Sequence, residues 1–432
     1  MSTYAEFLDR KRRVWTGGDG VPATNIHPLL FDWQAALVRW ALRKGKAALF
    51  CDTGLGKTFM QLSWAQHIPG RVLILAPLCV AEQTVAEGYK LGLSVTYARS
   101  RGETQGAKLA ITNYERLDAF DVSRFAGVVL DESSILKAFD GKTRGKLIAA
   151  FAKTPYRLCC TATPSPNDIS ELANHAEFLG LMTRQEFLAT WFVHDDQGWR
   201  MKGHAVQPFY RWMASWAMAM RRPSDIGYAD DGFVLPPLTI EDHVVEGGAS
   251  GGVLFPELGL KGIIGRLRAR RASVEDRVAE AVRIVATKPD VPWLLWCGLN
   301  DEADAVTAAI PGAMNVRGCD SYERKRDAVL GFVDGRIRVM VSKMRVLGFG
   351  MNFQHCADMA MIGLGDSYEQ YYQAIRRCWR FGQRRPVTAH IIVSNAERAI
   401  VSNVRRKQAD ADAMAKQLLV HMRGFEREEL AS

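Results

Sequence analysis

A segment that combines glycines with a lysine and a threonine, CDTGLGKT from Cys51 to Thr58, could bind phosphate groups. It follows a short apolar run and leads into a predicted helix from about Phe59, so backbone N–H groups and the helix N-terminus would face a phosphate chain. Lys57 would contact the β- and γ-phosphates of a nucleotide, and Thr58 would hold Mg²⁺. Cys51 stands where GxxxxGK[ST] has its first glycine, and a chance glycine turn is the alternative. The residues predicted to contact the nucleotide are Thr53, Gly54, Leu55, Gly56, Lys57 and Thr58.

Two adjacent carboxylates end another apolar run, GVVLDESS from Gly127 to Ser134. Asp131 could hold Mg²⁺ through water while Glu132 orients and polarises an attacking water. An acidic pair after a strand is also an ordinary feature of a helix N-terminus. The phosphate-binding segment upstream favours the catalytic interpretation.

Three further segments offer polar groups to the same ligand. Gln34 in LLFDWQ carries a donor and an acceptor that match an adenine edge. Thr161 in TATP could sense phosphate or link two lobes, although threonines at strand ends are commonly caps. Gly348 and Gly350 in KMRVLGFGMNFQ permit close backbone approach to phosphate, and a plain tight turn explains them equally well.

The segment QAIRRCWRFGQ, from Gln373 to Gln383, predicts an amphipathic helix. Gln373, Arg377 and Arg380 fall on one face, which we expect to point outward, and apolar residues on the other. Arg377 and Arg380 could neutralise charge that develops on a γ-phosphate, because the arginine fork is planar and permanently charged. A solvated basic face is the alternative.

The elements that must position these residues alternate between apolar runs and helix-like stretches, which predicts an α/β fold with parallel sheets covered on both faces. The runs span residues 47–52, 71–77, 108–113, 127–132 and 157–163 in the first half, and 292–298, 338–343, 359–363 and 387–393 in the second. Ligands of such sheets gather at the carboxyl ends of the strands.

The same alternation predicts two lobes in tandem. We expect a first lobe at 1–240, a flexible linker at 241–264 that contains GGASGG, and a second lobe at 265–432 with a helical tail. Aromatic residues near 173–222 predict a small helical insertion, in which they form a core, with base stacking as the alternative.

The composition is that of a globular protein, with 48% hydrophobic and 24% charged residues. The net charge of +9 is compatible with a polyanionic partner, and the basic run from Lys261 to Lys288 is a candidate contact or a solvated helix face. The eight cysteines include no CxxC pair, which predicts that they are reduced core residues and form neither a disulfide framework nor a cysteine-ligated zinc site. The N-terminus lacks the apolar core of a signal peptide and no apolar run is long enough to span a bilayer, so we expect a cytoplasmic protein.

The ordered motifs, from about Pro28 to Val393, resemble those of superfamily-two helicases and, more closely, of the Swi/Snf-type DNA translocase branch. They are LLFDWQ, DTGLGKT, LILAP, ITNYERL, LDESS, TATP, VLGFGMNF and QAIRRCWRFGQ. The QAxxRxxRxGQ form and the FVLPPLT segment favour that branch over DEAD-box RNA helicases. The compact length is similar to that of small bacteriophage and prophage helicases. Two departures are Ser134 and Trp379, each at a position where the family often has histidine.

The resemblance implies two RecA-like lobes with an ATP site in the cleft between them. It implies that Gln34 reads adenine, that Lys57 and Thr58 hold phosphates and Mg²⁺, and that Asp131 and Glu132 run hydrolysis. Arg377 and Arg380 become candidate arginine fingers. The expected activity is Mg-ATP hydrolysis coupled to movement on DNA, in the cytoplasm of a bacterial or phage-infected cell.

Duplex DNA is the expected partner, with single-stranded DNA as the alternative. We expect no association with a membrane, and we expect a monomer. A strand-separating DNA or RNA helicase is one alternative function. Another is a binding module that uses ATP as a clamp for a replication or recombination partner.

Overall fold

The computed structural model describes residues 15–18, 20–22, 25–77, 80–137, 141–165, 168–195, 198–246, 270–347 and 352–431. The chain packs as two compact units, one made of Met1–Phe233 with Asp410–Ser432 and the other of Val234–Ala409. Among the described helices, none is both long enough and apolar enough to cross a bilayer. Six of the seven described cysteines are buried, Cys319 is exposed, and none of the seven is in a disulfide.

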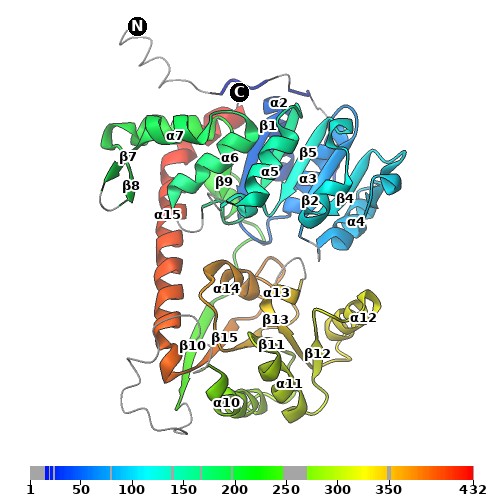
Figure 1. Cartoon of the computed structure of the whole chain (residues 1–432), viewed down its shortest axis with the longest axis vertical. Coiled ribbons are helices and arrows are strands. Elements are labelled where there is room, and N and C mark those ends of the chain that lie inside the picture. Colours follow the sequence, from blue (N-terminus) through cyan, green and yellow to red (C-terminus); the bar gives the residue numbers. More distant parts are fainter. Residues whose placement is uncertain are drawn as a thin grey trace. The chain divides into compact units, whose positions relative to one another are not determined.

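The first unit is built on a seven-stranded sheet in the order β3-β4-β2-β5-β6-β1-β9, in which every pairing is parallel (Figure 1). The strands are β1 (Lys46–Cys51), β2 (Val72–Ala76), β3 (Val95–Tyr97), β4 (Leu109–Asn113), β5 (Gly127–Asp131), β6 (Tyr156–Cys160) and β9 (Ala217–Met220). Five of them coincide with the apolar runs of the first half, so the predicted parallel sheet is confirmed there. The short strands β3 and β9 were not predicted from the sequence.

Alternate residues of these strands face two separate cores, as the two-residue period of a strand requires. Ala48 and Phe50 pack in one core, and Ala47, Leu49 and Cys51 in the other. The first core is covered by α5 (Lys142–Phe151), α6 (Leu172–Leu179), α7 (Arg184–Trp191) and α8 (Val206–Ala214). The second is covered by α2 (Asp32–Lys44), α3 (Lys57–His67) and α4 (Ala81–Lys90). A sheet covered on both faces explains why its strands are continuously apolar.

The region predicted as a helical insertion is only partly helical. Besides α6, α7 and α8 it contains an antiparallel hairpin, β7 (Phe192–Asp195) with β8 (Gly198–Met201), and it ends in β9, which pairs with β1. The prediction of an aromatic core is confirmed, because the side chains of Trp191 and Trp216 are almost completely buried. They pack in the first core, so they are unavailable for stacking on bases.

The second unit contains a six-stranded sheet in the order β10-β15-β14-β11-β13-β12, again parallel at every pairing. Its strands are β10 (Leu238–Val245), β11 (Trp293–Cys297), β12 (Met314–Val316), β13 (Val339–Lys343), β14 (Asp358–Ile362) and β15 (Val387–Ser394). The described helices between these strands are α10 (Val274–Ala286), α11 (Asn300–Ala309), α12 (Tyr322–Val333), α13 (Met344–Leu347) and α14 (Tyr368–Ile375). Four of its strands coincide with the predicted apolar runs.

The units divide the chain differently from the expected lobes at two places. The expected boundary at residue 240 falls inside β10, and most of the expected linker, 247–264, lies outside the described residues. The long helix α15 (Arg398–Ala431) is shared, since its residues from Asp410 onward belong to the first unit. Leu418 and Met422 of that part pack into the first core.

Candidate nucleotide-binding site

The loop after β1 has the backbone that a phosphate-binding loop requires. Gly54 and Gly56 have φ of 92° and 70°, in the left-handed region that favours glycine. Gly56 is the N-cap of α3 and offers no side chain to the first N–H groups of that helix, which leaves them for an anion. Lys57 Nζ donates to the carbonyls of Cys51 at 3.0 Å and Asp52 at 3.3 Å. The ammonium group of Lys57 therefore lies against the start of the loop, beside the place where a phosphate would bind.

Gln34 braces this loop from α2. Its Oε1 accepts from the N–H of Phe31 at 3.0 Å, and its Nε2 donates to the carbonyl of Leu55 at 3.0 Å. A Cβ on Gly56 would lie only 2.4 Å from Gln34 Nε2, so the loop and the glutamine fit together only with glycine at that position. The contact joins two motifs that lie 21 residues apart. The adenine-reading role of Gln34 stays a prediction.

Asp131 ends β5 and is buried between two hydrogen bonds. Gln61 Nε2, one turn after Lys57 on α3, donates to Asp131 Oδ1 at 2.6 Å. Tyr114 Oη donates to the backbone carbonyl of Asp131 at 2.6 Å. Burial raises the pKa of Tyr114 well above its ordinary value, so this hydroxyl keeps its proton and remains a donor. The carboxylate is thereby held against the helix that begins with the phosphate loop.

Glu132 is the one non-glycine residue with positive φ, 53°, in the described part of the chain. Such a conformation costs about 1–2 kcal/mol and occurs preferentially at functional sites. Here it turns the carboxylate toward the neighbouring strand, where Thr161 Oγ1 donates to Glu132 Oε2 at 3.4 Å. Thr161 Oγ1 in turn accepts from the N–H of Thr163 at 3.2 Å.

The sheet order explains why these motifs meet. Strand β6 lies between β1 and β5, and Cys160 is the register partner of both Leu49 and Asp131. Thr161 thus follows β6 at the same edge at which the phosphate loop follows β1 and Glu132 follows β5. In a parallel sheet this carboxyl edge is where ligands bind.

Two residues of α6 contact the segment after the acidic pair, and no motif in the sequence predicted either of them. Ser133 Oγ lies 3.1 Å from His175 Nε2, and Asn174 Nδ2 donates to the carbonyl of Leu136 at 2.8 Å. Complete burial lowers the pKa of His175 to about 3, so the imidazole is neutral at ordinary pH. The helicase resemblance expects a histidine at Ser134; this chain brings one to the neighbouring Ser133 from a different helix.

No family model matches this chain, and a search of curated proteins finds no match to its sequence.

The arginine segment of the second unit differs from the predicted continuous helix. Helix α14 ends at Ile375 and the following residues form turns. Arg377 is buried, with Nε donating to the Gln373 carbonyl at 3.0 Å and a terminal nitrogen to Gln373 Oε1 at 2.7 Å. The prediction that Arg377 points outward is therefore wrong, because the buried amide of Gln373 draws the guanidinium inward. Arg380 lies beyond the helix and is partly exposed.

Trp379, which stands where the family often has histidine, is a packing residue. Its Nε1 donates to the carbonyl of Pro236 at 2.7 Å, and the guanidinium carbon of Arg376 lies 4.9 Å from its ring. The contact ties the arginine segment to the FVLPPLT segment. Gly348, the remaining predicted site residue, lies outside the described residues.

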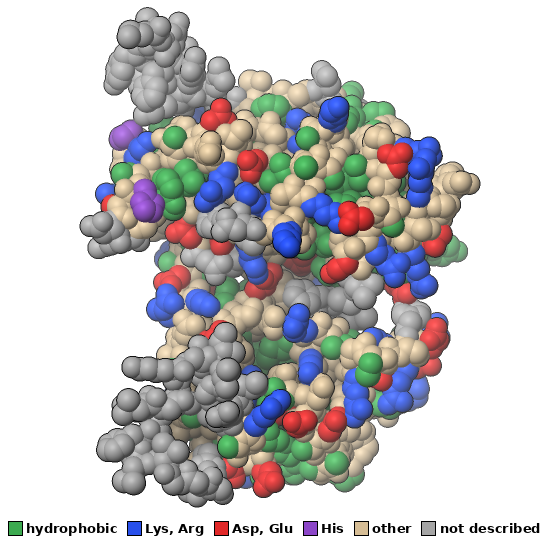
Figure 2. Space-filling model, viewed as in Figure 1, with side chains coloured by type: hydrophobic (Ala, Val, Ile, Leu, Met, Phe, Trp, Pro, Cys, Tyr) green, Lys and Arg blue, Asp and Glu red, His purple; other side chains and the backbone are tan. Residues whose placement is uncertain are grey.

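The basic run is described only from Arg270 onward, and most of its described charges have partners. Arg277 is completely buried, and one of its terminal nitrogens lies 2.7 Å from Glu302 Oε1. Arg283 pairs with Glu280, and Lys288 with Asp358. On the face drawn in Figure 2, basic side chains are spread over both units with acidic ones among them. The described part of the run thus has a structural role, and nucleic-acid contact by the run stays a prediction.

Proposed function

We propose that this protein is a nucleic-acid-dependent ATPase that couples Mg-ATP hydrolysis to movement on DNA. One observation carries the proposal: the phosphate loop, Thr161 and the acidic pair Asp131 and Glu132 follow adjacent parallel strands at one edge of a sheet. The left-handed Glu132 and its contact with Thr161 support a role beyond that of a helix cap.

The residues at this edge are of the types that bind ATP and Mg²⁺ in proteins. The uncapped start of α3 and the left-handed glycines suit a phosphate chain, and Lys57 supplies a cation beside them. Thr58 and Asp131 would hold Mg²⁺, which neutralises phosphate charge. Glu132 would orient the attacking water. Hydrolysis of this kind needs positioning and charge neutralisation more than covalent help from the protein.

The second unit enters the proposal through its arginines and through the contact between Trp379 and Pro236. Arg380 is the better candidate to neutralise charge on the γ-phosphate, since Arg377 is engaged by Gln373. The contact between Trp379 and Pro236 joins the two segments whose sequences favour the duplex-DNA branch. The choice of duplex DNA over RNA rests on that resemblance.

The decisive experiment measures ATP turnover by the full chain with duplex DNA, single-stranded DNA and RNA side by side. We expect the largest stimulation with duplex DNA. Stimulation by RNA alone would refute the choice of DNA, and displacement of a strand would favour the strand-separating alternative. Slow ATP turnover that no nucleic acid stimulates, together with a stable complex between this protein and a partner protein, would favour the ATP-gated binding module.

Variants test the roles of individual residues. Lys57→Ala, Glu132→Gln and Arg380→Ala should each lower turnover by at least about 100-fold, since each removes a charge or base that acts in the transition state. Glu87→Gln on α4 and Arg336→Ala, an exposed arginine of the second unit, are matched controls that should keep wild-type turnover. Normal turnover in Lys57→Ala would contradict the assignment of the phosphate loop.

A further inference from the structure

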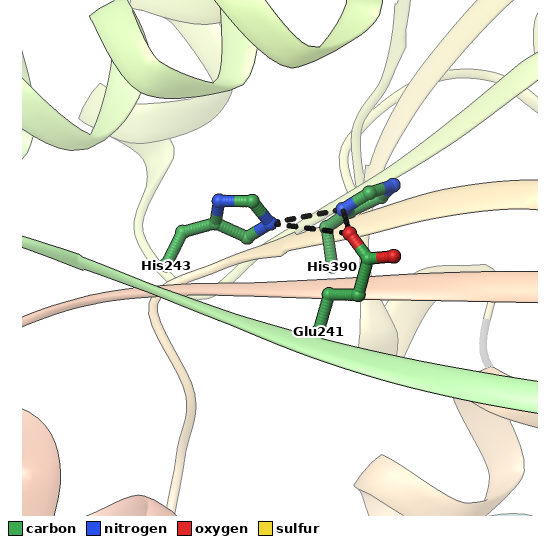
Figure 3. A group of neighbouring side chains, drawn as sticks. All are labelled: Glu241, His243 and His390. Carbon is green, nitrogen blue, oxygen red and sulfur yellow. Dashed lines mark hydrogen bonds and ion pairs between the residues drawn. The ribbon is translucent and has the colours of Figure 1, made fainter.

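Two histidines and a glutamate of the second unit converge outside the candidate nucleotide site. Glu241 and His243 lie on β10 and His390 on the neighbouring β15 (Figure 3). Alternate residues of a strand share a face, so Glu241 and His243 project to the same side of the sheet. The register places His390 directly beside Glu241. The parallel pairing of two strands thus brings together side chains that are 147 residues apart in the chain.

The three ligand atoms are spaced as a tetrahedral metal site requires. His243 Nε2 and His390 Nδ1 lie 3.0 Å apart, and Glu241 Oε2 lies 3.3 Å from the second nitrogen and 3.9 Å from the first. Zinc bonds to such atoms at about 2.0–2.2 Å, and in a tetrahedron this bond length separates neighbouring ligands by about 3.4 Å. The observed separations lie on both sides of that value. An ion therefore fits among the three atoms with only small side-chain movements.

A second carboxylate sets the tautomer that a metal needs. Glu280 of α10 has Oε1 at 3.0 Å from His243 Nδ1 and is the acceptor for a proton on that nitrogen. The proton on Nδ1 leaves the lone pair on Nε2, which is the nitrogen that faces His390 and Glu241. Carboxylate partners of this kind orient histidine ligands and raise their basicity. Arg283 holds Glu280 in turn through a contact of 2.7 Å.

We propose that Glu241, His243 and His390 form a binding site for a zinc ion. Two imidazoles and one carboxylate are a ligand set of zinc, and three protein ligands leave the fourth position to water. Water reaches the site because the Glu241 side chain is half exposed.

The ion would fasten an edge strand. Among the strands that the structure describes, β10 has one neighbour, β15, and zinc would join the two strands through their side chains. This role is independent of the proposed ATPase activity.

The test uses the full chain after removal of metal with a chelator. Calorimetric titration with Zn²⁺ should give one ion per chain, and Co²⁺ should give the visible absorption bands of a four-coordinate site, which Zn²⁺ then abolishes. Zinc should also raise the midpoint of thermal unfolding, since a ligand that binds only the folded state stabilises it.

Variants locate the ion. Glu241→Gln and His243→Gln should each abolish stoichiometric binding. Because the Glu241 side chain is half exposed, Glu241→Gln should keep the fold, which circular dichroism checks. Glu280→Gln keeps all three ligands and should weaken binding by about 10–100-fold. Asp242→Asn is the matched control, since Asp242 lies between the two β10 ligands but pairs with Arg405 at 2.7 Å, and it should bind zinc as the wild type does.

Two results would overturn the proposal. One is the absence of Co²⁺ bands and of zinc binding in the wild type, which would leave the contacts as hydrogen bonds between the rings. The other is binding that Glu241→Gln and His243→Gln leave unchanged, which would put the ion elsewhere. Lys57→Ala should bind zinc normally, so failure of the ATPase proposal and failure of this one are distinguishable.

Discussion

Glu426 of α15 gives a pH-dependent prediction that can be worked out in magnitude. Its Oε1 accepts from the N–H of Ala219 on β9 at 2.6 Å, and complete burial raises the pKa of the carboxyl from 4.5 to about 8. When this end of the helix opens, the carboxyl meets water and releases its proton. Opening therefore becomes easier as the pH rises from about 4.5 to about 8, and below that window the carboxyl imposes no penalty.

Between about pH 6 and about pH 8 the two pKa values predict a loss of about 2 kcal/mol, or about 50-fold in the opening equilibrium. Glu426→Gln keeps an acceptor for Ala219 but has no titratable group, so it should escape this loss. The assay is hydrogen exchange, read by mass spectrometry on peptides from residues 410–431 of both proteins at both pH values.

The informative quantity is the ratio of wild-type to variant opening. Intrinsic exchange and the titration of other groups are common to both proteins and cancel, so the ratio isolates Glu426. We expect it to rise by about 50-fold between about pH 6 and about pH 8. Peptides from β4, at the far side of the same sheet, are the control. A ratio that is the same at both pH values would refute the burial argument.

Other variants test the first unit. Gly56→Ala should destabilise this unit by about 1–2 kcal/mol and weaken ATP binding, because Gly56 has φ of 70° and an added Cβ would lie 2.4 Å from the Gln34 side chain. Denaturation measures the loss of stability and nucleotide titration the loss of affinity. Wild-type values in both assays would contradict the close fit of Gly56 against Gln34. The pKa of His175 is about 3 in the folded protein and 6.5 in the unfolded chain. As the pH falls below about 6.5, the unfolded chain therefore binds a proton that the folded protein excludes, and this lowers the stability. Relative to His175→Gln, the free energy of unfolding of the wild type, measured by denaturation, should fall by about 3 kcal/mol between about pH 7 and about pH 4. A difference between the two proteins that does not change with pH would exclude His175 as the cause.

Much of the first unit follows from local patterns in the sequence. Continuous apolar runs that end in small or polar residues predicted five of its strands. They also predicted that CDTGLGKT, TATP and the acidic pair share an edge, because parallel strands bring their carboxyl ends together. The contacts among these motifs, such as Gln34 with Leu55, depend on side-chain packing and had no signal in the sequence.

The arginine segment shows where periodicity misleads. Its spacing predicts one helix with outward arginines, but the helix stops at Ile375 and Arg377 turns inward to Gln373. Hydrogen bonds that the guanidinium donates to the buried Gln373 replace its contacts with water, and no pattern of apolar residues predicts that exchange.

The sequence by itself determined the α/β class, most of the strands and the motifs at their ends, because strand periodicity and turn chemistry act over a few residues. Only the tertiary structure decided which distant residues meet. The pairing of His175 with Ser133, the convergence of Glu241, His243 and His390, and the sharing of α15 between the two units all depend on strand register and helix packing. Strand register and helix packing are determined by the burial of whole elements. They bring together residues that are far apart in the sequence, and no local pattern marks such residues as partners.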